Sequence, residues 1–281
     1  MNALGIMQGR LSVAARGRPQ AFPRATWQQE FFDARDCRFD RLEWLVSDDR
    51  LEENPLLSDH GVQQILRHVG ATGVRVTSLC ADCFMSRPFV RVTDLDRRSS
   101  VEVLKRVIAR SARIGVEVVL IPVLEAAAIR DRAEGIELLE ILRDAIGLAA
   151  MHGIRVGLES DLTGVEMRWL IDQAGLPALA AYYDVGNATA LGHDVAADVR
   201  ALGPALCGVH IKDRRRAGPS VPLGRGEADF SVFFEALSDV GYTGPLILET
   251  PVGDDPLVMA RSHQAFVQDH LRACHGARAP R

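Results

Sequence analysis

Short apolar runs alternate with longer amphipathic stretches along the whole chain. The runs are rich in Val, Ile and Leu and mostly apolar on both faces, which is typical of strands buried on both sides in a parallel sheet. We therefore predict eight strands, at residues 4–7, 41–46, 74–79, 116–122, 154–159, 179–184, 207–211 and 246–249. Helical patterns lie between and after them, at residues 26–37, 58–70, 94–115, 130–153, 164–175, 193–203, 229–241 and 256–274.

Glycine closes most of these helical stretches, as is typical where a helix ends and the chain turns into the next strand. The glycines concerned are Gly70, Gly115, Gly153, Gly175, Gly203 and Gly241. Eight strand-then-helix units in one uninterrupted series predict an α/β fold, a (β/α)8 TIM barrel. A doubly wound open sheet is the structural alternative. The number of units and the lack of a glycine-rich phosphate loop after the first strand argue against it.

The chain length agrees with a single barrel. It has 281 residues, and barrels of this kind run to about 250 residues as one unit. No linker, repeat or low-complexity tract divides the sequence. We therefore expect one domain over residues 1–281, with about residues 275–281 as a loose tail.

Composition and charge exclude several classes of protein. The 33 basic and 37 acidic residues give a net charge of −4, so no positive field would gather a nucleic acid. No secretory signal is visible, and no run of about 18 apolar residues could span a membrane. The five cysteines are scattered and odd in number, which favours a reducing cytoplasm over a disulfide framework. One Cys-x-x-Cys pair, Cys80 and Cys83, has no second pair to complete a zinc site.

Four consecutive predicted strands each end in a side chain that can bind a metal: Glu159, Asp184, His210 and Glu249. A barrel places its chemistry at the carboxyl ends of its strands, and neighbouring strands lie about 5 Å apart. The four side chains can therefore converge on one ion. Each alone could instead be a helix cap or a satisfied polar residue. Three carboxylates crowded together without a cation would repel one another.

This donor set favours an oxygen-preferring divalent ion. Three carboxylates and one imidazole suit Mn²⁺ best, with Mg²⁺, Co²⁺ and Zn²⁺ as alternatives. An ion bound to neighbouring oxygens of an α-hydroxy ketone would lower the pKa of the adjacent C–H and stabilise an enediolate. One glutamate could then remove a proton and another group return it.

The whole chain resembles the xylose isomerase-like TIM-barrel superfamily, in its sugar phosphate isomerase/epimerase branch. The resemblance is carried by "LGIMQGRL", "FDRLEW", "SLCADCFM", "GLES", "YDVGNA", "HIKDR" and "LILET". In the ketose 3-epimerases and inosose dehydratases of this superfamily, a Glu, Asp, His, Glu set at strands 5 to 8 holds a divalent metal. The resemblance thus implies that Glu159 and Glu249 exchange protons with substrate while also binding the metal, with Asp184 and His210 as the remaining ligands.

Other residues are candidate substrate contacts. The ketose epimerases carry a histidine three residues after the strand-6 Asp, where this chain has Asn187, and an arginine six residues after the strand-7 His, where it has Arg216. Asn187 keeps hydrogen bonding but loses a titratable group, which weakens the narrow 3-epimerase assignment. Lys212, Glu43 and Glu125 could also reach the substrate, although a buried salt bridge explains Glu43 and Glu125 nearly as well.

The leading hypothesis is a cytoplasmic, metal-dependent isomerase or epimerase of a small sugar or sugar phosphate. A lyase that dehydrates a keto-cyclitol is the alternative, since both reactions start from an enediolate. An apurinic endonuclease is more remote, because the strand ends show one ligand histidine and the net charge is negative. A non-catalytic binding protein on a barrel scaffold is the fourth hypothesis. The expected partner is a small carbohydrate, with no nucleic acid and no membrane; a homo-oligomer stays open.

Overall fold

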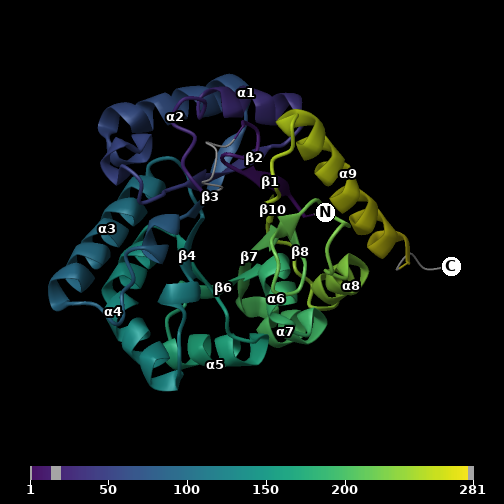
Figure 1. Ribbon diagram of the computed structural model, residues 1–281. Coiled ribbons are helices and arrows are strands. Elements are labelled where there is room, and N and C mark those ends of the chain that lie inside the picture. Colours follow the sequence, from purple (N-terminus) through teal and green to yellow (C-terminus); the bar gives the residue numbers. More distant parts are fainter. Residues whose placement is uncertain (1, 14–19, 278–281) are drawn as a thin grey trace.

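The backbone closes into a barrel of eight parallel strands in the computed structural model, which describes residues 2–13 and 20–277 (Figure 1). Strands follow one another around the barrel, and β1 pairs with β10 to close it. The barrel strands are β1 (Leu4–Met7), β2 (Arg41–Leu45), β3 (Arg75–Cys80), β4 (Val118–Val123), β5 (Arg155–Ser160), β6 (Leu179–Asp184), β7 (Leu206–Ile211) and β10 (Leu246–Leu248). The predicted TIM barrel is confirmed, and every predicted strand coincides with one of these.

Helices surround the barrel as an outer ring (Figure 1). They are α1 (Gln29–Asp36), α2 (Asp59–Thr72), α3 (Asp94–Ala112), α4 (Arg132–Met151), α5 (Gly164–Ala174), α6 (Val185–Leu191), α7 (Val195–Leu202), α8 (Phe230–Asp239) and α9 (Pro256–Ala277). Short 3-10 turns follow strands β2, β3 and β4, at η1 (Leu51–Glu53), η2 (Pro55–Leu57), η3 (Asp82–Met85) and η4 (Glu125–Ala127), and η5 (Gly203–Ala205) lies between α7 and β7. Two features are absent from the sequence prediction: helix α6, directly after β6, and the hairpin of β8 (Asp213–Arg214) and β9 (Ser220–Val221).

The helix ends show why the chain turns where it does. Thr163 and Glu166 form a reciprocal capping box at the start of α5, and Gly175 ends that helix at a φ of 59°, a conformation open to glycine at little cost. The predicted end of α2 was wrong by three residues. Gly70 lies inside that helix, which ends at Thr72 and is capped by Gly73 with a φ of 76°.

One glycine shapes the barrel interior. A side chain at Gly208 on β7 would collide with the ring of Tyr182 on β6, since a Cβ atom there would lie 2.2 Å from the ring. The missing side chain lets the tyrosine ring lie across the interior, where its hydroxyl donates to Oε2 of Glu43 on β2 at 2.8 Å. The sequence at β7 thus makes room for a polar contact across the barrel.

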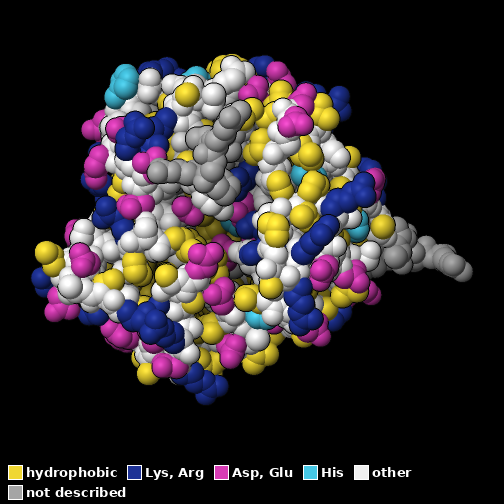
Figure 2. Space-filling model, in the orientation of Figure 1, with side chains coloured by type: hydrophobic (Ala, Val, Ile, Leu, Met, Phe, Trp, Pro, Cys, Tyr) yellow, Lys and Arg dark blue, Asp and Glu magenta, His cyan; other side chains and the backbone are white. Residues whose placement is uncertain are grey.

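Residues 275–277 of the expected tail belong to α9, and residues 278–281 lie outside the described part of the chain. None of the described helices is both long enough and apolar enough to cross a membrane. Near the centre of the ring the surface is hollowed, and Asp and Glu side chains with a few Lys and Arg side chains surround the hollow (Figure 2).

Candidate metal centre

Three of the four predicted ligands meet at the ends of adjacent strands. Glu159, Asp184 and His210 each offer one ligand atom, and these atoms lie within 4.8 Å of one another. The register of the sheet causes this, because Asp184 pairs directly with His210 across β6 and β7. The three residues are 5%, 4% and 1% exposed, so this group, which could hold a metal ion, is shielded from bulk water.

Glu249 adjoins this group on its His210 side. It follows β10 directly, is buried, and places Oε2 2.9 Å from Nδ1 of His210. Two ligands that each lie about 2.1 Å from one ion are about 3 Å apart when they subtend a right angle. Nδ1 is 3.9 Å from the nearest oxygens of both Glu159 and Asp184, which fits wider angles about the same point. The spacing therefore agrees with a shared ion.

The ring of His210 is oriented by a residue behind it. Its Nε2 lies 2.6 Å from Oε1 of Glu43, which is fully buried and also bound by Tyr182. A carboxylate partner fixes the proton on Nε2 and turns the lone pair of Nδ1 outward, the usual arrangement of metal-binding histidines. Nδ1 faces Oε2 of Glu249 at 2.9 Å, which is an ion pair when the ring is protonated. The structure places Glu43 beneath the imidazole, not at the open rim.

The two oxygens of Asp184 have different roles. Oδ1 accepts from the backbone N–H of Asn187 at 2.8 Å and so caps α6. Oδ2 is buried without a hydrogen bond, although the Lys212 ammonium is 3.0 Å away. One residue therefore both starts a helix and directs its other oxygen, ion-paired with Lys212, into the cluster.

The charges around His210 are compatible with an added cation. Lys212 lies 3.0 Å from Asp184 and 2.9 Å from Glu249, and Arg10 lies 3.4 Å from Glu249. Four buried carboxylates, Glu43 included, thus face two permanent cations. When Glu159 is ionised and His210 is neutral, as metal ligands must be, two negative charges remain, and one divalent ion would balance them. The buried donors and their charge fit such an ion.

The two glutamates differ electrostatically. Burial, reinforced by Asp184, raises the pKa of Glu159 to about 8. Burial would also raise the pKa of Glu249, but Lys212 and His210 hold it well below its usual range. Burial likewise opposes a charge on His210, yet Glu43 and Glu249 raise its pKa well above the ordinary value. The cluster therefore favours a positive charge beside Nδ1, which a metal can supply in place of a proton.

Asn187 reaches the cluster, whereas Arg216 and Glu125 do not. The Asn187 amide donates to Oε1 of Glu159 at 2.7 Å. Arg216 packs against Gly192 and lines a cavity of about 330 Å³ outside the barrel mouth. Glu125 is exposed on η4, where its backbone N–H donates to Asp161. Among the described residues no hydrogen bond joins Arg216 or Glu125 to the predicted ligands.

Several residues at the site had not been predicted. Gln20 donates to Oε1 of Glu249 at 2.6 Å and Arg214 donates to Asn187 at 2.8 Å. Asp82, on η3, has its pKa raised to about 7 by burial and by the charge of Glu249. The sequence carried a partial signal only for Arg214, which lies in the arginine run after β7.

The cysteines take no part in a disulfide. All five are free, and Cys80 and Cys83 are buried. Burial raises the pKa of both thiols, which leaves them protonated and unreactive.

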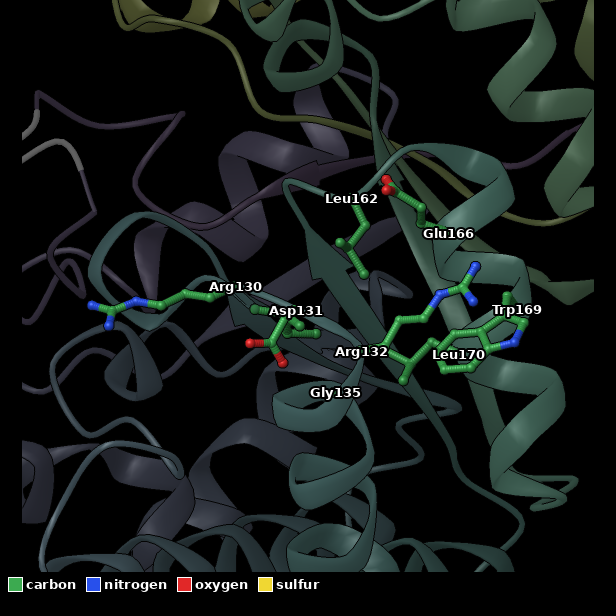
Figure 3. Close-up of a pocket in the computed structure, with 9 residues that line it drawn as sticks. Arg130, Asp131, Arg132, Gly135, Leu162, Glu166, Trp169 and Leu170 are labelled. Carbon is green, nitrogen blue, oxygen red and sulfur yellow. The ribbon is translucent and has the colours of Figure 1, made fainter.

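A separate cavity of about 290 Å³ lies near the starts of α4 and α5 (Figure 3). Its acidic groups are already engaged, since Asp131 caps α4 and Glu166 belongs to the capping box of α5. Arg132 lies over the ring of Trp169, 4.5 Å from its centroid. None of the predicted site residues lines this cavity, so the strand ends remain the candidate site.

Comparison with known proteins gives the same architecture. A family profile described as xylose isomerase-like TIM barrel matches residues 31–270. L-ribulose-5-phosphate 3-epimerase UlaE of Salmonella heidelberg (strain SL476) is 26% identical over 235 residues, which cover 79% of this chain and 81% of that enzyme.

Solved structures are similar over nearly the full length. The 3-keto-D-glucoside 4-epimerase YcjR of E. coli has a TM-score of 0.73 at 18% identity, covering 96% of this chain and 100% of that one. The D-psicose 3-epimerase of Clostridium cellulolyticum H10 has a TM-score of 0.74 at 16% identity, covering 96% and 99%. At these identities the structures establish the shared fold.

Proposed function

Because this chain belongs to the xylose isomerase-like TIM barrel family, we propose that it is a divalent-metal-dependent isomerase or epimerase of a small sugar or sugar phosphate. One observation carries the proposal: His210, held from behind by Glu43, turns Nδ1 toward the buried oxygens of Glu159, Asp184 and Glu249. Buried carboxylates that lie this close repel one another unless cations lie among them, and an ion beside Nδ1 would add to the positive charge that Lys212 supplies.

The names of similar proteins narrow the substrate class. UlaE acts on L-ribulose 5-phosphate, and the similar solved structures are described as epimerases of D-psicose and of a 3-keto-D-glucoside. The substrates in these names are all carbohydrates that contain a ketone group. We extend this class to the present chain as ketoses or ketose phosphates, with epimerisation beside the carbonyl as the reaction.

The site residues would have separate roles in the reaction. Glu159, Asp184, His210 and Glu249 would hold the ion. When bound, a divalent ion polarises the carbonyl and stabilises the enediolate that forms when the adjacent C–H loses its proton. Glu159 on β5 and Glu249 after β10 are separated around the barrel by β6 and β7, so they can approach one carbon from different sides.

The environments of the two carboxylates suit opposite proton-transfer roles. Lys212 and His210 keep Glu249 ionised, as a base must be, whereas without a bound ion burial beside Asp184 favours a proton on Glu159. Neighbouring acids with separated pKa values are the usual mark of such a pair. Lys212 would keep Glu249 fixed and ionised. Burial of both glutamates limits proton exchange with water during the transfer.

The test is proton exchange in deuterated solvent. The protein with Mn²⁺ is incubated with ketoses, ketose phosphates and inososes, and the products are followed by NMR. An epimerase incorporates deuterium beside the carbonyl and yields an epimer; loss of water would identify the lyase alternative. Glu249→Gln should abolish exchange, while Glu117→Gln, at an exposed carboxylate just before β4, should not. Failure to bind Mn²⁺ together with absence of exchange would refute the proposal.

A further inference from the structure

Both proposed catalytic glutamates accept a hydrogen bond from a carboxamide side chain. Nδ2 of Asn187, in α6, lies 2.7 Å from Oε1 of Glu159. Nε2 of Gln20, in the segment between β1 and α1, lies 2.6 Å from Oε1 of Glu249. The two contacts arise from unrelated parts of the chain and have the same chemistry.

An arginine orients each carboxamide. Nη1 of Arg214 donates to Oδ1 of Asn187 at 2.8 Å, and Nη2 of Arg10 donates to Oε1 of Gln20 at 2.9 Å. A guanidinium group only donates hydrogen bonds. It therefore holds the amide oxygen toward itself and turns the amide NH2 group toward the glutamate. A freely rotating amide could present its oxygen instead and repel the carboxylate.

The arginine beside Asn187 is itself anchored. Nε and Nη2 of Arg214 both donate to the carbonyl oxygen of Gly218, at 3.0 and 2.9 Å, within the β8–β9 hairpin. Asp213, the residue before it, is fully buried and accepts three backbone N–H groups, from Gly224, Gly226 and Ala228. The fork of Arg214 is thus fixed by the loop and not only by Asn187.

In each glutamate the amide contacts one carboxylate oxygen and leaves the other oxygen facing His210. In both glutamates Oε1 faces the amide. Oε2 is the oxygen near Nδ1 of His210, at 3.9 Å for Glu159 and 2.9 Å for Glu249. One oxygen is therefore held by the protein, and the other is left for the ion and the substrate. Such a division restricts rotation of the carboxylate about its last torsion.

We propose that Arg214–Asn187 and Arg10–Gln20 are positioning pairs that fix which oxygen of Glu159 and of Glu249 faces the reacting centre. The inference rests on the proposed function for its consequence in catalysis, but the orientation of the amides does not depend on a metal. Asn187, at the position of the family's substrate-contacting histidine, acts here through Glu159. Arg214, not Arg216, is the arginine of this loop that serves the site.

The first test reads the orientation directly. In ¹⁵N-labelled protein the side-chain NH2 signals of Asn187 are identified by their loss in Asn187→Leu, which keeps the backbone N–H that Asp184 caps. We expect slow hydrogen exchange for these signals in the wild type and fast exchange in Arg214→Ala. Arg215→Ala is the matched control, since Arg215 is exposed in the same loop and the hydrogen bond to Asn187 comes from Arg214. Circular dichroism confirms that each variant folds.

The second test measures the effect of the positioning pair on Mn²⁺ binding. Mn²⁺ affinity, measured by titration, should fall about 10-fold or more in Arg214→Ala and Asn187→Leu, the usual effect of losing a partner behind a metal ligand, and stay unchanged in Arg215→Ala. Asn187→His, which keeps an N–H donor, should bind Mn²⁺ more tightly than Asn187→Leu.

The outcomes separate the two proposals. If Arg214→Ala resembles Arg215→Ala in both exchange and affinity, the positioning role is wrong. If the wild type binds no Mn²⁺ while Arg214→Ala still frees the Asn187 amide, the proposed function fails and the positioning of Glu159 stands.

Discussion

Acid should destabilise the protein through one buried histidine, His263 on α9. Its side chain is 2% exposed. The backbone N–H of Leu223 donates to Nε2 at 3.3 Å, so the ring is neutral and its proton lies on Nδ1, 2.8 Å from Oγ1 of Thr250. Protonation of Nε2 would remove the acceptor for Leu223. Thr250 follows Glu249 directly, so the contact also supports the rim of the site.

The size of this loss of stability follows from the pKa of His263. Burial lowers the pKa of His263 from 6.5 to about 4. Between these two pH values the unfolded chain binds a proton that the folded protein does not, so the stabilising contribution is present above pH 6.5 and is lost as the pH falls toward 4. At 1.4 kcal/mol per unit, the loss in the free energy of unfolding reaches an upper limit of about 3 kcal/mol.

Urea unfolding followed by tryptophan fluorescence across this pH range tests the reasoning. His263→Gln, which cannot take up a proton, should show a flatter loss of stability with acid than the wild type, by up to about 3 kcal/mol. His60→Gln, at an exposed histidine in α2, should retain the wild-type slope. Identical slopes in all three proteins would refute the assignment of His263 as a buried neutral group.

Four further substitutions have definite expected outcomes. Glu43→Gln should weaken Mn²⁺ binding about 10–100-fold in a calorimetric titration, because the carboxylate behind His210 is lost. An unchanged affinity would show that Glu43 does not contribute to metal binding through His210. Glu159→Gln and Glu249→Gln should each lower turnover at least ~10²-fold in the NMR assay, and near-normal turnover in both with Mn²⁺ bound would exclude the two-glutamate mechanism. Burial raises the pKa of Glu30 from 4.5 to about 7, so the stability that protonated Glu30 contributes is lost as the pH rises between these values. Glu30→Gln should remove that part of the pH dependence of the free energy of unfolding. An unchanged pH dependence in this variant would contradict the prediction.

The barrel and the meeting of its strand ends could be predicted because both follow from local pattern. Doubly buried parallel strands read as continuous apolar runs, and parallel pairing brings equivalent strand ends to one rim. Asp184 and His210, predicted from their places at strand ends, are direct neighbours in the sheet. Their contact needed no knowledge of loop conformation.

Contacts across the barrel and from loops could not be predicted in this way. Glu43 was considered as a substrate contact, yet it lies beneath His210, because the ring of Tyr182 crosses the interior over a glycine. Arg214 rather than Arg216 reaches Asn187, because a two-stranded hairpin turns the chain after β7. Strands of two residues leave no periodic signal, and spacing in sequence says little about direction in such a loop.

The most direct test of the account is a crystal structure of the protein soaked with Mn²⁺, with anomalous scattering used to locate the ion. We predict one strong peak at about 2.0–2.3 Å from Nδ1 of His210 and from carboxylate oxygens of Glu159, Asp184 and Glu249. The peak should be absent in Asp184→Ala crystals treated in the same way. A wild-type map without a peak among these side chains, with the Lys212 ammonium still bridging Asp184 and Glu249 at saturating Mn²⁺, would contradict the central claim.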